Sequence, residues 1–120
     1  TSPAGFQMGT MWTTSDQAQF ASGLRCVAGH EPVLDMMGRI VDYQHWGLGR
    51  IGGARFKGGW NHYEGGHLAR QFGLIPGPNG DIAVAITAHS PKGHEGSFAM
   101  LNELADGLSA MRGDLPTSRC

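Results

Sequence analysis

The 120-residue chain contains few charges, two cysteines and no long apolar run. Nine lysine and arginine residues are spread singly among ten acidic residues, which gives a formal net charge of −1. That distribution lacks the basic footprint of a nucleic-acid or membrane-surface protein. The longest apolar stretch, residues 82–88, is far shorter than the roughly 20 residues that span a bilayer. We therefore expect no nucleic-acid partner.

The length allows one small domain with a single core. The chain begins at Thr1, without an initiator methionine or a signal-peptide pattern. This is the beginning expected of a processed or truncated C-terminal piece. Two marks of an acyl-transfer nucleophile are also missing: no serine has a lysine three residues later, and no G-x-S-x-G elbow occurs.

The two cysteines, Cys26 and Cys120, allow two interpretations. In one, Cys26 is a small buried hydrophobe and Cys120 a free thiol. In the other they form a disulfide, which would remove roughly 4–5 kcal/mol of chain entropy from the unfolded state. A cysteine at the last residue has few packing reasons to exist, so we expect the disulfide. A disulfide indicates an extracytoplasmic protein, secreted or in the cell envelope.

Helical periodicity predicts a first region of helices over residues 12–42. Thr14 and Gln17 fit a capping box at the start of one helix, and Pro32 suits the first turn of a second. The second helix is expected to bury one apolar stripe, made of Val33, Met36, Met37, Ile40 and Val41.

A period of two then predicts antiparallel strands within residues 45–88. Trp46–Gly49 is expected to be a short extended segment, and three strands follow near 54–60, 67–75 and 81–88. A final helix is predicted over 97–112, capped by Ser97. The order predicts an α/β (α+β) fold, an antiparallel β-meander flanked by helices.

The strand at 81–88 alternates large apolar with small residues, which is typical of a strand covered on both faces. In a three-stranded meander it would nevertheless be an edge, and an apolar edge favours pairing with another strand. We expect a further segment beside it.

The motif Lys57-Gly58-Gly59-Trp60 opens the first of these strands. Together with the helix from Thr14, the run Trp46–Gly49 and the final helix, it resembles the C-terminal part of the serine β-lactamase/penicillin-binding-protein-like (transpeptidase-like) family, particularly its actinobacterial members. The resemblance covers most of the chain. It implies that residues 1–120 are the C-terminal portion of one β-lactamase-like domain, whose sheet has five strands.

The resemblance also implies roles for individual residues. Lys57 would set a positive potential for a substrate carboxylate, Gly59 would leave room for the substrate, and the backbone N–H of Trp60 would be an oxyanion-hole donor. Gly58 would contact substrate, although the family usually has Thr or Ser there, and this departure puts β-lactam turnover in doubt. Asn61, His62 and Glu64 would line the cleft.

Because the nucleophile is absent, we expect the chain to supply one wall of an acyl-transfer site without being catalytic alone. It would be a serine hydrolase only if a missing N-terminal segment or a companion chain supplied the serine. The ligand would be peptidoglycan-like or β-lactam-like. The alternative is an inactive binding or scaffold protein of the cell envelope.

Six histidines (His30, His45, His62, His67, His89, His94) raise the possibility of a metal. No H-E-x-x-H motif or helical i,i+4 pair is present, so we expect solvent-facing loop histidines and no metal site. The run from Gly47 to Gly52 reads G-x-G-x-x-G, but it lacks a preceding apolar strand and a following helix. We expect no cofactor.

Overall fold

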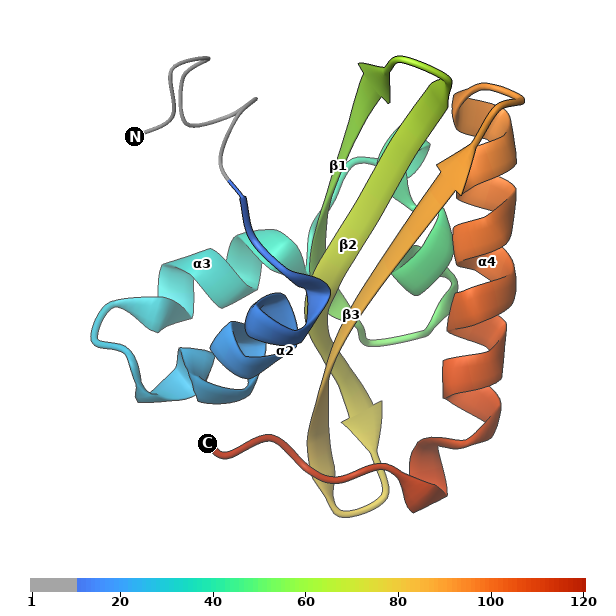
Figure 1. The fold of residues 1–120 in the computed structure, drawn as a ribbon. Helices are drawn as coiled ribbons and strands as arrows, with labels where there is room; N and C mark the ends of the chain where they lie inside the picture. The colour runs from blue at the N-terminus through green and yellow to red at the C-terminus, as the bar shows by residue number, and fades with distance from the viewer. Residues whose placement is uncertain (1–10) are drawn as a thin grey trace.

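Three antiparallel strands form the sheet of the computed structural model, which describes residues 11–120 (Figure 1). They are β1 (Arg55–Tyr63), β2 (Gly66–Gly77) and β3 (Gly80–Ser90), hydrogen-bonded in the order β1-β2-β3. Two-residue turns join them, and the first contains Gly65 at φ 97°, a conformation that favours glycine. The predicted α+β class with an antiparallel meander is confirmed.

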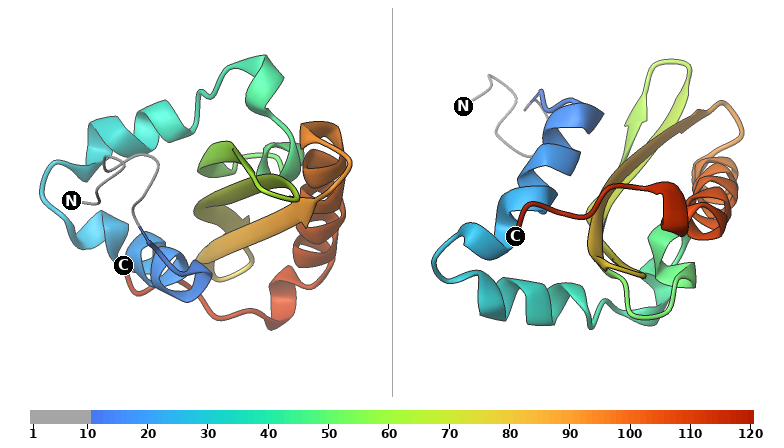
Figure 2. Two further views of the ribbon diagram at one scale, coloured as in Figure 1. Left: turned by 45° about the horizontal axis from the view of Figure 1, so that its top comes forward. Right: turned by 90° about the horizontal axis from the view of Figure 1, so that it is seen from below.

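One face of the sheet packs on α4 (His94–Ala110) and on the 3₁₀ helix η3 (Gly47–Arg50) (Figure 2). Alternate residues of β3 point to this face, as the strand period of two requires. The main core between these layers is formed by Leu48, Ile51, Ala54, Phe56, Ala69, Ile75, Ile82, Val84, Ile86, Ala88, Leu101 and Ala105.

The other face carries α2 (Thr14–Gly23), the 3₁₀ helix η1 (Leu24–Cys26) and α3 (His30–Met37) (Figure 1). Its core is smaller, consisting of Ala21, Leu24, Leu34, Met37 and Leu74. The apolar stripe expected of the second helix is therefore partly wrong. Leu34 and Met37 are buried, whereas Val33 and Met36 are 43% and 59% exposed, and the helix ends before Ile40 and Val41.

Two helices begin earlier than the sequence indicates. The N-cap of α2 is Thr13, whose hydroxyl accepts from the amide of Asp16 at 3.0 Å. The final helix begins at His94 behind Gly93, three residues before the expected cap. Ser97 is buried in its first turn, where its hydroxyl donates to the carbonyl of His67 at 2.8 Å. Ser97 therefore ties α4 to the sheet instead of capping the helix.

The expected extended segment at Trp46–Gly49 is instead η3. Gly47 adopts φ 60°, and its amide donates to Asn102 Oδ1 at 2.6 Å. Buried Gln71 accepts from the amide of Leu48 at 2.7 Å and donates to the carbonyl of Trp46 at 2.6 Å. These long-range partners satisfy the backbone of the turn in place of a strand neighbour.

Cys26 and Cys120 form the expected disulfide, with their Cα atoms 5.8 Å apart. The C-terminal tail crosses from the end of α4 to α2 (Figure 1). On its way, the amide of Ser118 donates to the carbonyl of Asp81 at 2.7 Å. Beyond this contact, β3 has no strand partner on its outer edge among residues 11–120. None of the helices in the same range has the length and apolar character needed to cross a membrane.

Candidate functional site

Lys57 lies on β1, an edge strand of the sheet, and its side chain is exposed. Its ammonium group donates to Gln44 Oε1 at 3.0 Å and to the carbonyl of Gly58 at 2.7 Å. Gln44 belongs to the 3₁₀ helix η2 (Asp42–Gln44). The contacts hold the positive charge close to the edge of β1 without neutralising it, because both acceptors are uncharged.

A hollow of about 150 Å³ lies beside Lys57. Its lining includes Lys57, Gly59, Arg70, Phe72 and Trp12. Gly59 pairs with Arg70 across the strands, and nothing among the described residues lies within 4 Å of the position that a Cβ would occupy at Gly59. The surface of this hollow is apolar and suits an apolar group of a ligand, and Lys57 and Arg70 lie on the same face of the sheet beside it.

Arg70 and Trp12 are additions to the residues named from the sequence. The Arg70 guanidinium donates to the carbonyl of Trp12 at 3.2 Å, and the Trp12 ring meets the Phe72 ring edge-on with centroids 5.3 Å apart. The strand period already places Arg70 and Phe72 on one face. Only the register of β1 on β2 shows that this is the face of Lys57.

The backbone N–H of Trp60 lies on the outer edge of β1. Tyr63 and Gly66 flank a two-residue turn, and the residues that flank such a turn form a hydrogen-bonded pair. Hydrogen-bonded and non-hydrogen-bonded pairs alternate along antiparallel strands, so Gly59 and Arg70 form another hydrogen-bonded pair. Trp60 belongs to the alternate set, and its N–H therefore points away from β2.

Gly58 faces the opposite side of the sheet from Lys57, against Trp46. A Cβ at Gly58 would lie 2.6 Å from the Trp46 ring and 3.2 Å from Gln71. The Trp46 ring in turn stacks on Phe98 of α4 with centroids 4.2 Å apart, and Trp60 meets both rings edge-on. A threonine or serine at this position would collide with the aromatic cluster, so glycine here is a packing requirement.

The three remaining residues named from the sequence occupy different places. Asn61 lies on the same strand face as Lys57 and Gly59, and it is half-buried. Glu64 lies in the exposed turn after β1. The His62 side chain is on the opposite strand face, where its ring approaches those of His67 and His94. The structure thus groups Lys57, Gly59 and Asn61, and separates His62 from them.

The expectation that the histidines face solvent from loops is wrong for His67 and His94. His67 is the second residue of β2, His94 is the first residue of α4, and both are half-buried. Burial lowers the pKa of His94, and the neighbouring His67 and His62 lower it further. A lowered pKa keeps the His94 imidazole neutral around pH 7.

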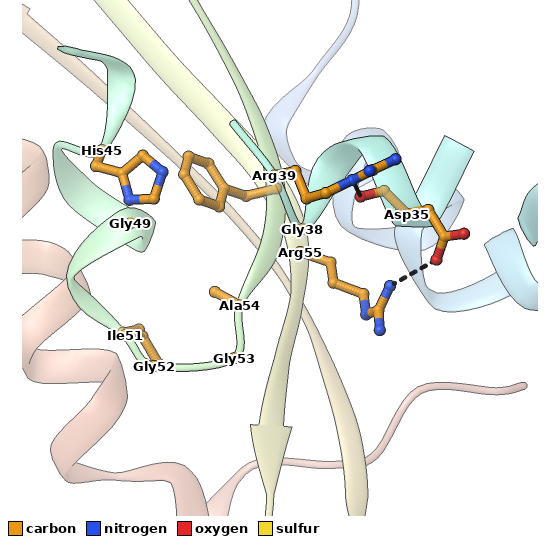
Figure 3. A pocket seen from close by; sticks show the side chains of 11 residues that line it. Asp35, Gly38, Arg39, His45, Gly49, Ile51, Gly52, Gly53, Ala54 and Arg55 are labelled. Carbon is orange, nitrogen blue, oxygen red and sulfur yellow. Dashed lines mark hydrogen bonds and ion pairs between the residues drawn. The ribbon is translucent and has the colours of Figure 1, made fainter. Parts of the chain in front are cut away.

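A larger hollow, of about 600 Å³, lies between α3 and the start of β1 (Figure 3). Asp35, Arg39, His45 and Arg55 contribute its polar side chains. The Arg55 guanidinium lies 3.6 Å from Asp35 and donates to the carbonyl of Leu34 at 3.1 Å, while Arg39 donates to the carbonyl of Asp35 at 3.4 Å. Because Asp35 offsets the charge of Arg55 here, whereas both acceptors of Lys57 are uncharged, we place the candidate site at the edge of β1 and not in this hollow.

Comparisons of the chain with protein-family models, with curated proteins and with solved structures gave no match.

Proposed function

We propose that this chain supplies the substrate-facing wall of a serine acyl-transfer site of the β-lactamase/D,D-peptidase class. In this proposal Lys57 attracts a substrate carboxylate, Gly59 leaves space for the substrate, and the Trp60 N–H stabilises the oxyanion. The single observation that carries the proposal is the direction of that N–H. It lies on the open edge of β1, one residue beyond Gly59 and three beyond the exposed Lys57.

The same strand edge would also position the substrate. A peptide-like substrate that lies along an edge strand forms hydrogen bonds to its outward amides and carbonyls. Gly59 and Asn61 face the side of Lys57, and Arg70 adds a second positive charge there. This arrangement favours an anionic peptidoglycan-like or β-lactam-like acyl compound as the ligand class.

The nucleophilic serine would come from the remainder of the domain, either an upstream segment or a companion chain. The outer edge of β3 supports this part of the proposal. An apolar hollow of about 470 Å³ runs beside β3, lined by Ile82, Val84, Ile86, Leu104, Leu108 and others. A further strand placed there would pair with the edge and cover these side chains. The disulfide fits an extracytoplasmic location for the assembled domain.

The first test uses a fluorescent penicillin and a fluorophosphonate probe on the protein expressed from the whole gene. We expect covalent labelling of an upstream serine and none of the 120-residue chain alone. Lys57→Ala should slow labelling by at least about 10-fold, since it removes the charge that attracts the substrate carboxylate. Lys92→Ala is the matched control, because Lys92 is also exposed but lies in the turn before α4.

The second test isolates the Trp60 N–H. Trp60→Pro removes both the ring and the amide hydrogen, whereas Trp60→Ala removes only the ring. Proline is tolerated on an edge strand where the N–H points outward. We expect Trp60→Pro to label about 10²–10³ times more slowly than Trp60→Ala. Equal rates in two folded variants would exclude the oxyanion role.

A catalytically inactive binding or scaffold protein of the cell envelope is the second candidate. The packing of Gly58 against Trp46 favours it, because that position cannot present the hydroxyl that the family uses for substrate. A folded whole-gene product that binds a peptidoglycan fragment but takes up neither covalent probe would select this candidate over the enzyme.

A further inference from the structure

Three histidines from three elements meet at one end of the sheet. They are His62 near the end of β1, His67 at the start of β2 and His94 at the start of α4. The ring centroids are 4.3 Å apart for His62 and His67, 4.4 Å for His67 and His94, and 4.8 Å for His62 and His94. One ring nitrogen from each residue lies within 4.8 Å of the other two.

The fold holds these rings together through backbone structure. His62 and His67 are directly opposite each other across the β1–β2 hairpin. Ser97 fixes the first turn of α4 to the carbonyl of His67, and the His94 ring stacks on Phe98 at a centroid distance of 5.8 Å. Two of the three imidazoles are therefore positioned by other contacts, and only His62 is exposed.

Two nitrogens in the cluster lack hydrogen-bond partners. The Nδ1 atoms of His67 and His94 are both buried, and neither has a partner among residues 11–120. Buried polar atoms are nearly always paired, and a bound water or ion is one of the ordinary explanations for an exception. The cluster thus offers two imidazole nitrogens, on His67 and His94, that no other described residue uses.

We propose that His62, His67 and His94 bind one divalent transition-metal ion, with Zn²⁺ as the preferred ion. The donor set is three imidazoles, and imidazole suits zinc, copper and nickel but not magnesium or calcium. The two cysteines are bonded to each other, so they do not compete as ligands. In a tetrahedral zinc site the bound nitrogens would be about 3.3 Å apart, given Zn–N distances of about 2.0–2.1 Å. The exposed His62 side chain can turn its nitrogen toward those of His67 and His94.

Three protein ligands leave the fourth position of a tetrahedral ion open, and the exposure of His62 places that position toward solvent. The ion would join the β1–β2 hairpin to α4, which are otherwise connected here by Ser97 and by ring packing. We therefore expect binding to stabilise the folded chain. This inference stands on the histidines alone and does not depend on the proposed acyl-transfer function.

The test uses the untagged oxidised chain, stripped with EDTA and desalted, at pH 7.5. Zn²⁺ is titrated by calorimetry, and Co²⁺ replaces it for absorption spectroscopy. We expect one Zn²⁺ per chain, a rise in thermal midpoint, and intense visible bands of tetrahedral Co²⁺. Mg²⁺ should produce no effect.

His62→Gln, His67→Gln and His94→Gln should each weaken Zn²⁺ binding at least about 10-fold, because even loss of an outer-shell partner has effects of that size. His89→Gln is the matched control, an exposed strand histidine outside the cluster. If His67→Gln or His94→Gln does not fold, His62→Gln still tests the proposed metal site, because His62 is exposed. Absence of stoichiometric Zn²⁺ in the wild type, or equal losses in His62→Gln and His89→Gln, would overturn the proposal.

Discussion

The two faces of the sheet differ in how completely they are covered. The α4 face buries a core of twelve residues and adds buried side-chain hydrogen bonds from Gln71 and Ser97. The α2–α3 face buries five residues, and large apolar side chains such as Phe20, Val33 and Met36 remain exposed on its helices. A globular domain gains most of its stability from buried apolar area.

The comparison shows that α4 and η3 cover their face of the sheet more completely than α2 and α3 cover theirs. In the proposed function, a further segment would cover the remainder, including the outer edge of β3. The disulfide lies on the less covered side, where it links η1 to the C-terminal tail. There a covalent bond supplements a small core, as it does in many small extracellular domains.

The largest effect is expected from removing the disulfide. The Cys26→Ser/Cys120→Ser double variant should lose about 4–5 kcal/mol of unfolding free energy, because the bond closes a loop of 94 residues in sequence separation. Guanidinium unfolding of the oxidised, the reduced and the double-variant chain measures this. A loss below about 1 kcal/mol would mean that the α2–α3 layer is held by packing, against the contrast drawn between the faces.

On the α4 face, buried Gln71 should be the most sensitive polar residue. Gln71→Ala leaves the amide of Leu48 and the carbonyl of Trp46 without hydrogen-bond partners. Each such group costs about 1–3 kcal/mol when it is buried and unpaired. We expect a total loss of at least about 2 kcal/mol in thermal and chemical unfolding. Gln19→Ala, on the exposed side of α2, is the control and should change little.

Neighbouring glycines in β1 provide a matched pair that separates the two faces. Gly58→Thr would push into Trp46 and should cost about 1–3 kcal/mol. Gly59→Thr enters open space and should be neutral or slightly stabilising, since threonine favours strands more than glycine does. Equal effects of the two substitutions on unfolding free energy would show that the register described for β1 is wrong.

The smallest effect concerns Asp106 of α4, which forms an ion pair with Arg50 of η3 at 2.9 Å. Its hydrogen bond from Arg50 lowers the pKa of Asp106 below the ordinary value. The folded state then binds fewer protons at acid pH, so this stabilisation is present above the ordinary pKa and is lost as pH falls through the lowered one. Asp106→Asn should slightly reduce the fall of unfolding free energy at acid pH. The effect is small because the ion pair is exposed. An unchanged slope of unfolding free energy against pH would contradict the lowered pKa of Asp106.

Local patterns predicted the order of elements, the three strands and the disulfide. They were less successful wherever a distant residue decides the local conformation. Trp46–Gly49 alternates like a strand, but Gln71 and Asn102 stabilise it as a 3₁₀ turn. Helical spacing predicted that Met36 is buried. In the structure Leu34 packs toward the sheet and is buried, and Met36 is exposed.

The candidate site illustrates the same limit. The motif located Lys57, Gly59 and Trp60 on one strand, but the addition of Arg70 depends on strand register. The histidine cluster depends on register and on where α4 begins, because His62 and His67 are symmetric about the turn and His94 is remote in sequence. No metal motif with regular spacing connects them.

Segment-resolved amide hydrogen exchange on the oxidised 120-residue chain tests the central contrast most directly. If the α2–α3 face is the incomplete one, amides of α2 and α3 should exchange through local opening well before those of β2 and α4, which should exchange only on global unfolding. Equal protection of α2, α3 and α4 would contradict the account, because it would show that both faces are already complete.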